Sequence, residues 1–265
     1  MIDANTQTKL ICFDLDDTII DDNWKFETTF CDCMKAILLG LAARAPEIDE
    51  ILVTMREIDG RLLEELPKDR KLLPTRLIQS WQETYRIVSE RRDIPVKPHI
   101  MSMIESYVWQ NFEPPYLVIA GAVDALVRIR AFPNVRMEIL TIGEPEIQLR
   151  KINHSRLNYY FDHIEIVYAG EDKGEYLRNK AGEFGGENVI MVGNSMRSDI
   201  NPALKAGVKA IHIPRSGWSR HNVEPLHNEY LEVRRIFELP EALSNLLHRD
   251  PGVVDASPNT VLESA

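Results

Sequence analysis

Cysteine is scarce in this chain, which has three in 265 residues: Cys12, Cys31 and Cys33. An odd and small number of cysteines does not provide a disulfide framework. Cys31 and Cys33 lie two positions apart in a segment with helical periodicity, so their side chains point in different directions. A zinc site would need a second pair of ligands, which the sequence does not offer beside them. We interpret the cysteines as residues of a protein in a reducing compartment.

Long apolar runs are also missing. Stretches such as Ala36–Ala43 are much shorter than the ~20 residues that span a bilayer. The polar N-terminal sequence MIDANTQT lacks the apolar region of a signal peptide. These two absences predict a cytoplasmic protein with no membrane partner.

Positive charge is the minority, because 31 Lys and Arg residues face 41 Asp and Glu residues, a net charge of −10. Nucleic-acid-binding proteins usually present a basic face. The nearest approach to a basic run here is Arg91-Arg92, which lies between Glu90 and Asp93. We therefore expect no nucleic-acid partner. A small anionic substrate is not excluded, since a bound cation can dominate the local charge of a site.

Between about residues 27 and 112, apolar residues recur three and four positions apart, which is typical of amphipathic helices. Four segments share the pattern: Phe30, Met34, Ile37, Leu38 and Leu41; Ile51, Met55, Ile58 and Leu62; Leu77, Ile78, Trp81, Tyr85 and Val88; and Ile100, Ile104, Tyr107 and Val108. Prolines at positions 46, 67, 74, 95 and 98 interrupt it. The block predicts a small four-helix bundle, and Glu113-Pro114-Pro115 predicts a linker or hinge after it.

The rest of the chain alternates between strand and helix patterns. Apolar runs predict strands at 9–14, 135–142, 163–168, 188–193 and 209–213, and periodicity predicts helices at 120–131, 146–158, 174–183 and 200–206. This succession predicts a parallel sheet covered on both faces. The predicted fold class is α/β, a Rossmann-like three-layer core with a parallel sheet, plus a smaller α-helical domain. We expect a core of residues 1–20 and 116–249, a helical domain of residues 21–115, and a loosely ordered tail at 250–265.

Two carboxylates follow the first predicted strand, in the run Phe13-Asp14-Leu15-Asp16-Asp17-Thr18. Residues two apart in a strand face the same side. Asp14 and Asp16 should therefore point together toward the carboxyl end of the sheet, where ligand sites of open α/β folds lie. Neighbouring carboxylates suit a nucleophile or metal ligand paired with a proton shuttle. The simpler interpretation is an acidic turn that caps a helix.

FDLDDT resembles DxDxT, the first motif of the haloacid-dehalogenase-like superfamily, and this resemblance implies further motif residues at the ends of later strands. Thr141 has a hydroxyl that, with adjacent backbone N–H groups, can bind phosphoryl oxygens. Lys173 precedes a predicted helix and can offset the charge of carboxylates and a phosphoryl group. Asn194 and Asp199 lie in the loop after the strand at 188–193 and offer an amide oxygen and a carboxylate to a magnesium ion. Taken alone, each is also typical of an ordinary turn or surface residue.

Taken in order, these motifs resemble those of the haloacid-dehalogenase-like superfamily. The run VGNSMRSDINPALKAG is similar to the family's last motif, GDSxxxD, and the helix after it. Asn194 stands where the family more often has an aspartate. The resemblance covers residues 9–20 and roughly 116–215. The helical block at about 21–115 has the position of the family's helical cap.

The resemblance implies a phosphatase that uses Mg²⁺ to hydrolyse a small phosphorylated metabolite through an aspartyl-phosphate. The implied catalytic residues are Asp14 as nucleophile, Asp16 as acid and base, and Lys173. The implied substrate-binding residues are Leu15, Thr141, Ile142 and Lys173, and the implied metal ligands are Asp14, Asp16 through its backbone carbonyl, Asn194 and Asp199. The cap would close over the site and select the leaving group. Asn23 and Trp24 are candidates for its hinge or mouth, or for packing.

Other functions on the same scaffold stay open. A 2-haloacid dehalogenase also uses an aspartate nucleophile but lacks the second aspartate of the first motif, so Asp16 favours a phosphatase. A phosphonate hydrolase needs a cap lysine for a Schiff base. Several lysines lie in or near the cap and do not decide this: Lys25, Lys35, Lys68, Lys71 and Lys97. The non-enzyme alternative is a phosphate-binding or regulatory module, for which Asn194 is the only support.

Overall fold

A parallel sheet forms the centre of the larger part of the molecule. The computed structural model describes residues 7–67, 70–71, 74–168, 172–215 and 223–248. The strands are β1 (Lys9–Phe13), β4 (Val135–Ile142), β5 (His163–Val167), β6 (Val189–Gly193), β7 (Lys209–His212) and β8 (Leu231–Glu232). They lie in the order β5-β4-β1-β6-β7-β8, and every neighbouring pair is parallel. The predicted parallel sheet is confirmed.

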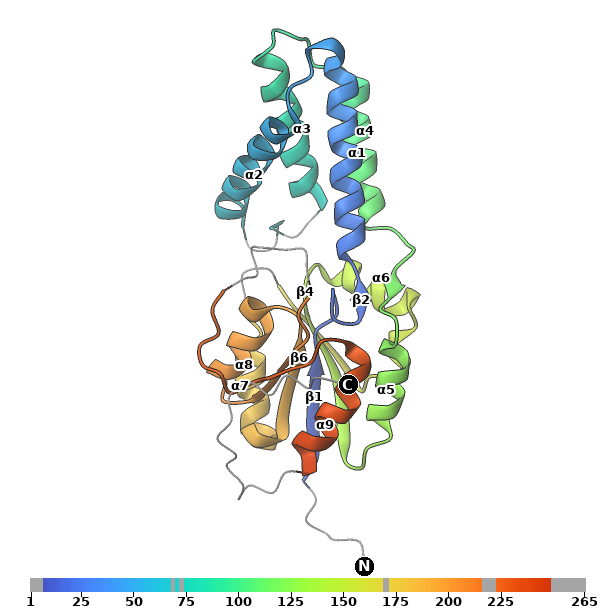
Figure 1. Ribbon diagram of the computed structural model, residues 1–265, viewed down its shortest axis with the longest axis vertical. Coiled ribbons are helices and arrows are strands. Elements are labelled where there is room, and N and C mark those ends of the chain that lie inside the picture. Colours follow the sequence, from blue (N-terminus) through green and yellow to red (C-terminus); the bar gives the residue numbers. More distant parts are fainter. Residues whose placement is uncertain (1–6, 68–69, 72–73, 169–171, 216–222, 249–265) are drawn as a thin grey trace, which may run out of the picture.

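Helices cover both faces of this sheet (Figure 1). They are α5 (Ala122–Arg130), α6 (Pro145–His154), α7 (Gly174–Phe184), α8 (Asn201–Lys205) and α9 (Leu239–His248). Alternate residues of β1 point to opposite faces. Ile11 and Phe13 pack with α5 and α9, whereas Leu10 and Cys12 pack with α7 and α8. All four side chains are fully buried, as expected for a central strand of a three-layer α/β fold.

A helical region is inserted into the chain after β1. It comprises α1 (Asn23–Leu41), α2 (Ile48–Glu65), α3 (Pro74–Glu90) and α4 (Pro98–Asn111), in agreement with the four predicted segments. The region has its own apolar core, in which Trp81 and Tyr85 are fully buried. At Gly40 the helices are so close that a Cβ would lie 2.8 Å from the Tyr85 ring. Figure 1 places the region beyond the carboxyl ends of the strands.

A short antiparallel pair of strands lies where the chain leaves the core for the helical region and where it returns. Strand β2 (Ile20–Asp21) leads to α1, and β3 (Leu117–Val118) follows α4. They pair with Ile20 opposite Val118 and Asp21 opposite Leu117. The predicted hinge at residues 113–115 falls between α4 and β3. The sequence did not predict these strands, because two residues are too few to show a period.

The remaining differences from the predicted elements are local. The helix predicted at 146–158 ends at His154, because Arg156 has a left-handed backbone (φ 55°) that ends the helix before a 3₁₀ turn. The helix predicted at 200–206 is preceded by one π-helical turn at Met196–Ile200. Strand β8 and helix α9 were not predicted. The tail predicted at 250–265 lies outside the described residues.

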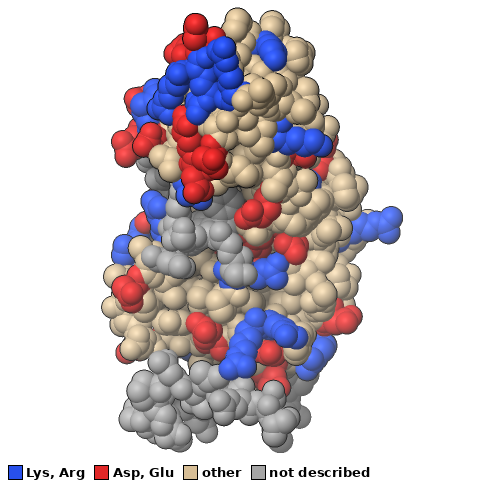
Figure 2. Space-filling view, turned by 45° about the horizontal axis from the view of Figure 1, so that its top comes forward, with Lys and Arg blue, Asp and Glu red and all other residues tan. Residues whose placement is uncertain are grey.

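The surface charge and the hydropathy of the described helices bear on the partners expected from the sequence. On the face shown in Figure 2, small groups of basic side chains lie next to small groups of acidic ones, and neither sign covers the face. Among the described helices, none combines the length and the apolar content needed to cross a bilayer. The expected lack of a nucleic-acid partner stays a prediction.

Candidate active site

Asp14 lies at the carboxyl end of β1, between the two strands that flank it. Its backbone N–H donates to the carbonyl of Val192 (2.9 Å), so the pairing with β6 continues one residue beyond the strand. Asp14 as a whole residue is 7% exposed, and its Oδ2 accepts a hydrogen bond from Thr18 Oγ1 (3.0 Å). A single loop thus provides both the carboxylate and the hydroxyl that orients it.

Lys173 joins this loop to the loop after β6. Its ammonium is 1% exposed and lies 2.6 Å from Asp14 Oδ1 and 2.7 Å from Asp199 Oδ1. The other oxygen of Asp199 accepts from the backbone N–H of Ser195 (2.8 Å). The structure therefore brings together three residues that the sequence places 26 and 159 positions apart. Two carboxylates share one cation, so the buried cluster has a net negative charge when both are ionised.

The loop after β6 has little room around Asp199. A Cβ at Gly193 would overlap the carboxyl group of Asp199, so this close approach requires a glycine. Asn194 follows, and its Oδ1 lies 3.4 Å from Thr18 Oγ1, which places the amide beside the Asp14 loop. The Asn194 carbonyl lies 3.0 Å from His212 Nε2, which donates to it when that nitrogen carries the proton.

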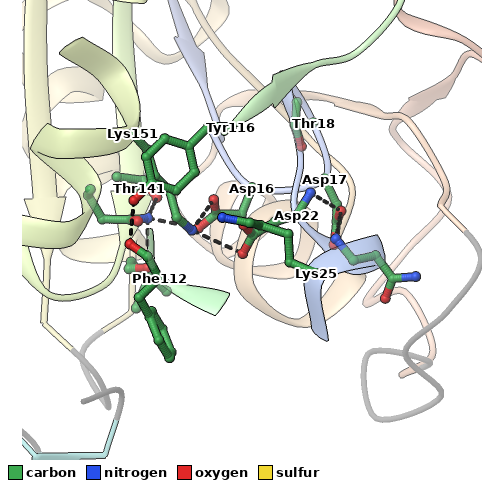
Figure 3. A network of polar contacts seen from close by, with 12 residues as sticks. Asp16, Asp17, Thr18, Asp22, Lys25, Phe112, Tyr116, Thr141 and Lys151 are labelled. Atoms are coloured by element: carbon green, nitrogen blue, oxygen red, sulfur yellow. Dashed lines mark hydrogen bonds and ion pairs between the residues drawn. The ribbon is translucent and has the colours of Figure 1, made fainter. Parts of the chain in front are cut away.

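Asp16 belongs to a second cluster, shown in Figure 3, that the sequence did not predict. Its Oδ1 lies 2.8 Å from the ammonium of Lys151, and its Oδ2 accepts from Gln148 Nε2 (2.8 Å). Gln148 also lies 2.8 Å from Thr141 Oγ1 and thereby links Asp16 to the end of β4. Lys151 lies 3.0 Å from Asp22 Oδ2 as well. Asp14 and Asp16 are each paired with a lysine of their own.

We expected Asp14 and Asp16 to point in the same direction because residues two apart in a strand do so. That reasoning was wrong, because these two residues do not lie in a strand. Strand β1 ends at Phe13, and a turn follows in which Asp17 has a left-handed backbone (φ 57°). Asp16 is therefore oriented by its contacts with α6 rather than by strand alternation. The sequence predicted a helix here, and the spacing of Gln148 and Lys151, which places both on one face of that helix, was the only local signal for their contact with Asp16.

Two of the expected substrate-binding residues, Leu15 and Ile142, have apolar side chains that pack in the core, and their role in substrate binding stays a prediction. Leu15 is fully buried in the core, and its carbonyl accepts from the N–H groups of Ile19 and Ile20 at 2.9 Å. Thr141 is 1% exposed, and Ile142 ends β4 with its side chain half-buried. Because the Leu15 side chain is fully buried, a contribution of Leu15 to substrate binding would have to come from its backbone.

Burial dominates the electrostatics of both clusters. Burial and, after it, the charge of Asp199 raise the pKa of Asp14 to about 7 against the opposing effect of Lys173. Burial also raises the pKa of Asp22 to about 6, helped by Asp16 and opposed by Lys151. A nearby cation stabilises the charged form of such carboxyls. Additional positive charge would therefore stabilise the ionised carboxyls of each cluster, because its single lysine offsets only part of the effect of burial.

The donors around Asp14 fit a magnesium ion. Among the described residues, no group of three or more His, Cys, Asp or Glu side chains could by itself hold a metal. Mg²⁺ does not require such a group, since it commonly uses one or two carboxylates and completes its shell with water and substrate phosphate. Asp14 and Asp199 supply two carboxylates, and Asn194 supplies a third hard oxygen beside them.

A hollow of about 1050 Å³ lies at the base of α1 and meets the Asp14 cluster at Thr18. Asn23 and Trp24, expected at the hinge or mouth, both line it. So do Thr18 from the Asp14 loop and Arg215 from the segment after β7, and Arg215 pairs with Asp21 of β2 at 3.1 Å. The hollow therefore reaches from the first motif to the start of the helical region.

Comparison with known families gives a consistent result. The family described as haloacid dehalogenase-like hydrolase matches residues 8–207. N-acylneuraminate-9-phosphatase of Mus musculus is 29% identical over 150 residues, which is 53% of this chain and only 58% of that protein. Glyceraldehyde 3-phosphate phosphatase of Pyrococcus abyssi is 24% identical over 250 residues, 89% of this chain and 94% of that protein.

Solved structures share the whole fold. A haloacid dehalogenase-like family hydrolase from Xanthomonas campestris is 25% identical, with a TM-score of 0.70 over 92% of this chain and 93% of that one. A magnesium-bound HAD hydrolase of Bacillus subtilis and a 2-haloacid dehalogenase of Pseudomonas syringae have TM-scores of 0.56 and 0.55 over 90% of this chain. At 17% and 18% identity, these two are evidence for the fold alone.

Proposed function

The chain belongs to the haloacid dehalogenase-like hydrolase family, and on that basis we propose that it is a magnesium-dependent phosphatase of a small phosphate monoester. The observation that carries the proposal is the pair of lysine-bound carboxylates, Asp14 with Lys173 and Asp16 with Lys151. One carboxylate can attack phosphorus while the other transfers a proton.

In the proposed first step, an Asp14 oxygen attacks phosphorus and the bond from phosphorus to the leaving oxygen breaks. Asp16 gives its proton to that oxygen, so an alcohol departs and an aspartyl-phosphate remains. In the second step, a water attacks the phosphorus and gives a proton to Asp16. The Asp14–phosphorus bond then breaks, which releases phosphate and restores both carboxyl groups.

The other residues of the site support these two steps. Magnesium held by Asp14, Asp199, Asn194 and the backbone carbonyl of Asp16 would neutralise charge on the phosphoryl group. Lys173 holds Asp14 and adds a further positive charge. We assign Thr141 and the backbone of Leu15 and Ile142 to the phosphoryl oxygens. The helical region, as a cap, would exclude water during the first step.

A small phosphorylated metabolite is the substrate class we propose. Both curated relatives named above are phosphatases of such compounds by name. The hollow at the base of α1 offers polar and aromatic lining to the remainder of a small substrate. Asp16 favours this function over dehalogenation, because a halide leaves without a proton whereas an alkoxide needs one.

Hydrolysis of p-nitrophenyl phosphate tests the proposal, with and without Mg²⁺, on the wild type, Asp14→Asn and Asp162→Asn. Asp162 is a matched control, because it forms an ion pair with Arg130 at the surface of the core. We expect turnover that needs Mg²⁺, vanishes in Asp14→Asn and persists in Asp162→Asn. Turnover that survives Asp14→Asn or chelation of the metal would contradict the mechanism.

The dehalogenase alternative predicts a different product. Halide release from 2-chloropropionate by the wild type, without hydrolysis of any phosphate in a metabolite screen, would favour it. Binding of inorganic phosphate without turnover of either substrate class would favour the non-catalytic module instead.

A further inference from the structure

Lys151 lies at the point where the core, the first motif and the chain leading to the cap meet. It is on α6, is 4% exposed and has two carboxylate partners, Asp16 at 2.8 Å and Asp22 at 3.0 Å. A buried ammonium is stable only when it is paired in this way. Figure 3 shows its nitrogen between the two carboxylates. The proposed mechanism uses Asp16 but gives no role to Lys151 or Asp22.

Asp22 is part of the connection to the cap. It directly precedes α1, and its backbone N–H donates to Asp17 Oδ1 (3.1 Å), as does that of Asn23 (3.0 Å). The first motif therefore holds the start of the cap through backbone contacts. Lys151 adds a side-chain contact from the core helix to the same position. A rotation of α1 about this connection would pull on Asp22 and, through Lys151, on Asp16.

The return connection from the cap lies beside the same cluster. Lys25, in the first turn of α1, donates to the carbonyl of Glu113 and lies 4.4 Å from the centre of the Tyr116 ring. Tyr116 in turn donates to the carbonyl of Phe112 at the end of α4 (2.5 Å). Both chain crossings between cap and core are thus tied to each other within the group of residues drawn in Figure 3.

Asp16 has little freedom in this arrangement. Gln148 occupies one of its oxygens and Lys151 the other, so two residues of α6 fix the plane of the carboxylate. Each carboxylate oxygen has two lone pairs, so the contacts leave room for the proton that Asp16 transfers. An acid that must reach a leaving-group oxygen loses much of its effect when it is displaced by about 1 Å.

We propose that Lys151 is a positioning residue that holds Asp16 toward the leaving-group oxygen and links its position to the cap through Asp22. The inference rests on the proposed phosphatase function and adds a mechanical connection from cap to acid. Lys151 does not touch the reacting atoms in this assignment. Its effect should therefore appear in the two steps in which Asp16 transfers a proton, and kcat/KM reports the first of them, the formation of the aspartyl-phosphate.

Leaving-group dependence isolates that step. A series of 4-substituted phenyl phosphates keeps the shape of the substrate and changes only the basicity of the leaving oxygen. Nitrophenolate leaves without help, whereas phenolate needs protonation. In Lys151→Met, we expect kcat/KM to fall on the order of tenfold more for phenyl phosphate than for p-nitrophenyl phosphate. Asp16→Asn should show the same selectivity more strongly, and Lys151→Arg should restore most of the wild-type ratio.

Two further variants separate positioning from general damage. Asp22→Asn keeps the contacts of Asp16 but weakens the link to the cap, so we expect it to shift the same ratio in the same direction. Arg76→Met removes a cation from a nearly buried carboxylate, Asp59, within the cap, and is the matched control. Any loss of kcat/KM in Arg76→Met should be equal for both substrates.

Several outcomes would overturn the inference. An equal loss on both substrates in Lys151→Met would reduce Lys151 to a structural role, and an unchanged ratio in Asp22→Asn would remove the link to the cap. If Lys151→Met does not fold, Lys151→Gln and Asp22→Asn carry the test. Failure of the phosphatase function would look different, because the wild type itself would then hydrolyse no phosphate in an Asp14-dependent way.

Discussion

Replacing Lys173 by methionine should lower the free energy of unfolding by about 3–5 kcal/mol at about pH 8, the usual cost of leaving a buried charge without its partner. Lys173 is 1% exposed and pairs at 2.6 and 2.7 Å with two carboxylates whose side chains are 10% and 0% exposed. Methionine keeps the length of the side chain, so packing changes little. The substitution leaves Asp14 and Asp199 as neighbouring buried charges. Such a loss is a large part of the total stability of a domain, about 5–15 kcal/mol.

The size of this loss should depend on pH. Burial already raises the pKa of Asp14 to about 7 in the wild type, and removing Lys173 removes a cause that lowers it. The folded variant then holds a proton on Asp14 that the unfolded chain releases above its ordinary pKa of about 3.9. Stability falls with rising pH wherever the folded state binds more protons. The difference from wild type should therefore be small at about pH 5.5 and largest at about pH 8.

Urea denaturation followed by circular dichroism in EDTA measures the effect at both pH values. Lys180→Met is the matched control, because Lys180 lies on α7, the helix that Lys173 directly precedes, and pairs with the exposed Glu183, a contact worth at most about 1 kcal/mol. Adding Mg²⁺ at the higher pH should recover part of the loss, since a divalent cation can replace the ammonium between the carboxylates. A loss below about 1 kcal/mol, or one that does not change with pH, would refute the reasoning.

Three further predictions concern other parts of the chain. Gly193→Ala should displace Asp199 and reduce kcat/KM for p-nitrophenyl phosphate about 10²-fold. Gly182→Ala is the control and should not reduce it, because a Cβ at Gly182 meets nothing within 4 Å. Equal activities of the two variants would contradict the close approach of Gly193 to Asp199. Cys31 should be the one thiol that a maleimide labels quickly in the native protein. It is exposed, whereas burial raises the pKa of Cys12 and Cys33. Mass spectrometry of the native and the urea-unfolded chain counts the labels. Mg²⁺ affinity should weaken about tenfold for each pH unit below the Asp14 pKa of about 7, because a proton competes with the metal; calorimetry that finds no such slope would contradict the assignment of Asp14 as a ligand.

Most of the fold could be predicted from local patterns. The residues that recur three and four apart became α1 to α4, and the apolar run at 135–142 became β4 with the predicted bounds. The failures were elements whose local signal is weak. The strands β2 and β3 have two residues each, and the helix predicted through Arg156 stopped because one residue adopts a left-handed backbone.

The candidate site could be predicted only in part. Asp14, Lys173 and Asp199 come together because parallel strands end at one edge of the sheet, which is a general property of the fold. Lys151 could not be found in this way. Its partner Asp16 is 135 positions away, and a lysine on a helix has the same local pattern whether it faces solvent or a carboxylate.

The sequence by itself therefore determined the α/β architecture, the inserted helices and the order of the motifs, because periodicity and strand ends are local properties of the chain. Only the tertiary structure decided which lysine pairs with which carboxylate, and that Asp22 shares one with Asp16. Those pairings depend on how α6 packs against the first motif. That packing is the sum of many distant contacts, none of which has a local sequence pattern.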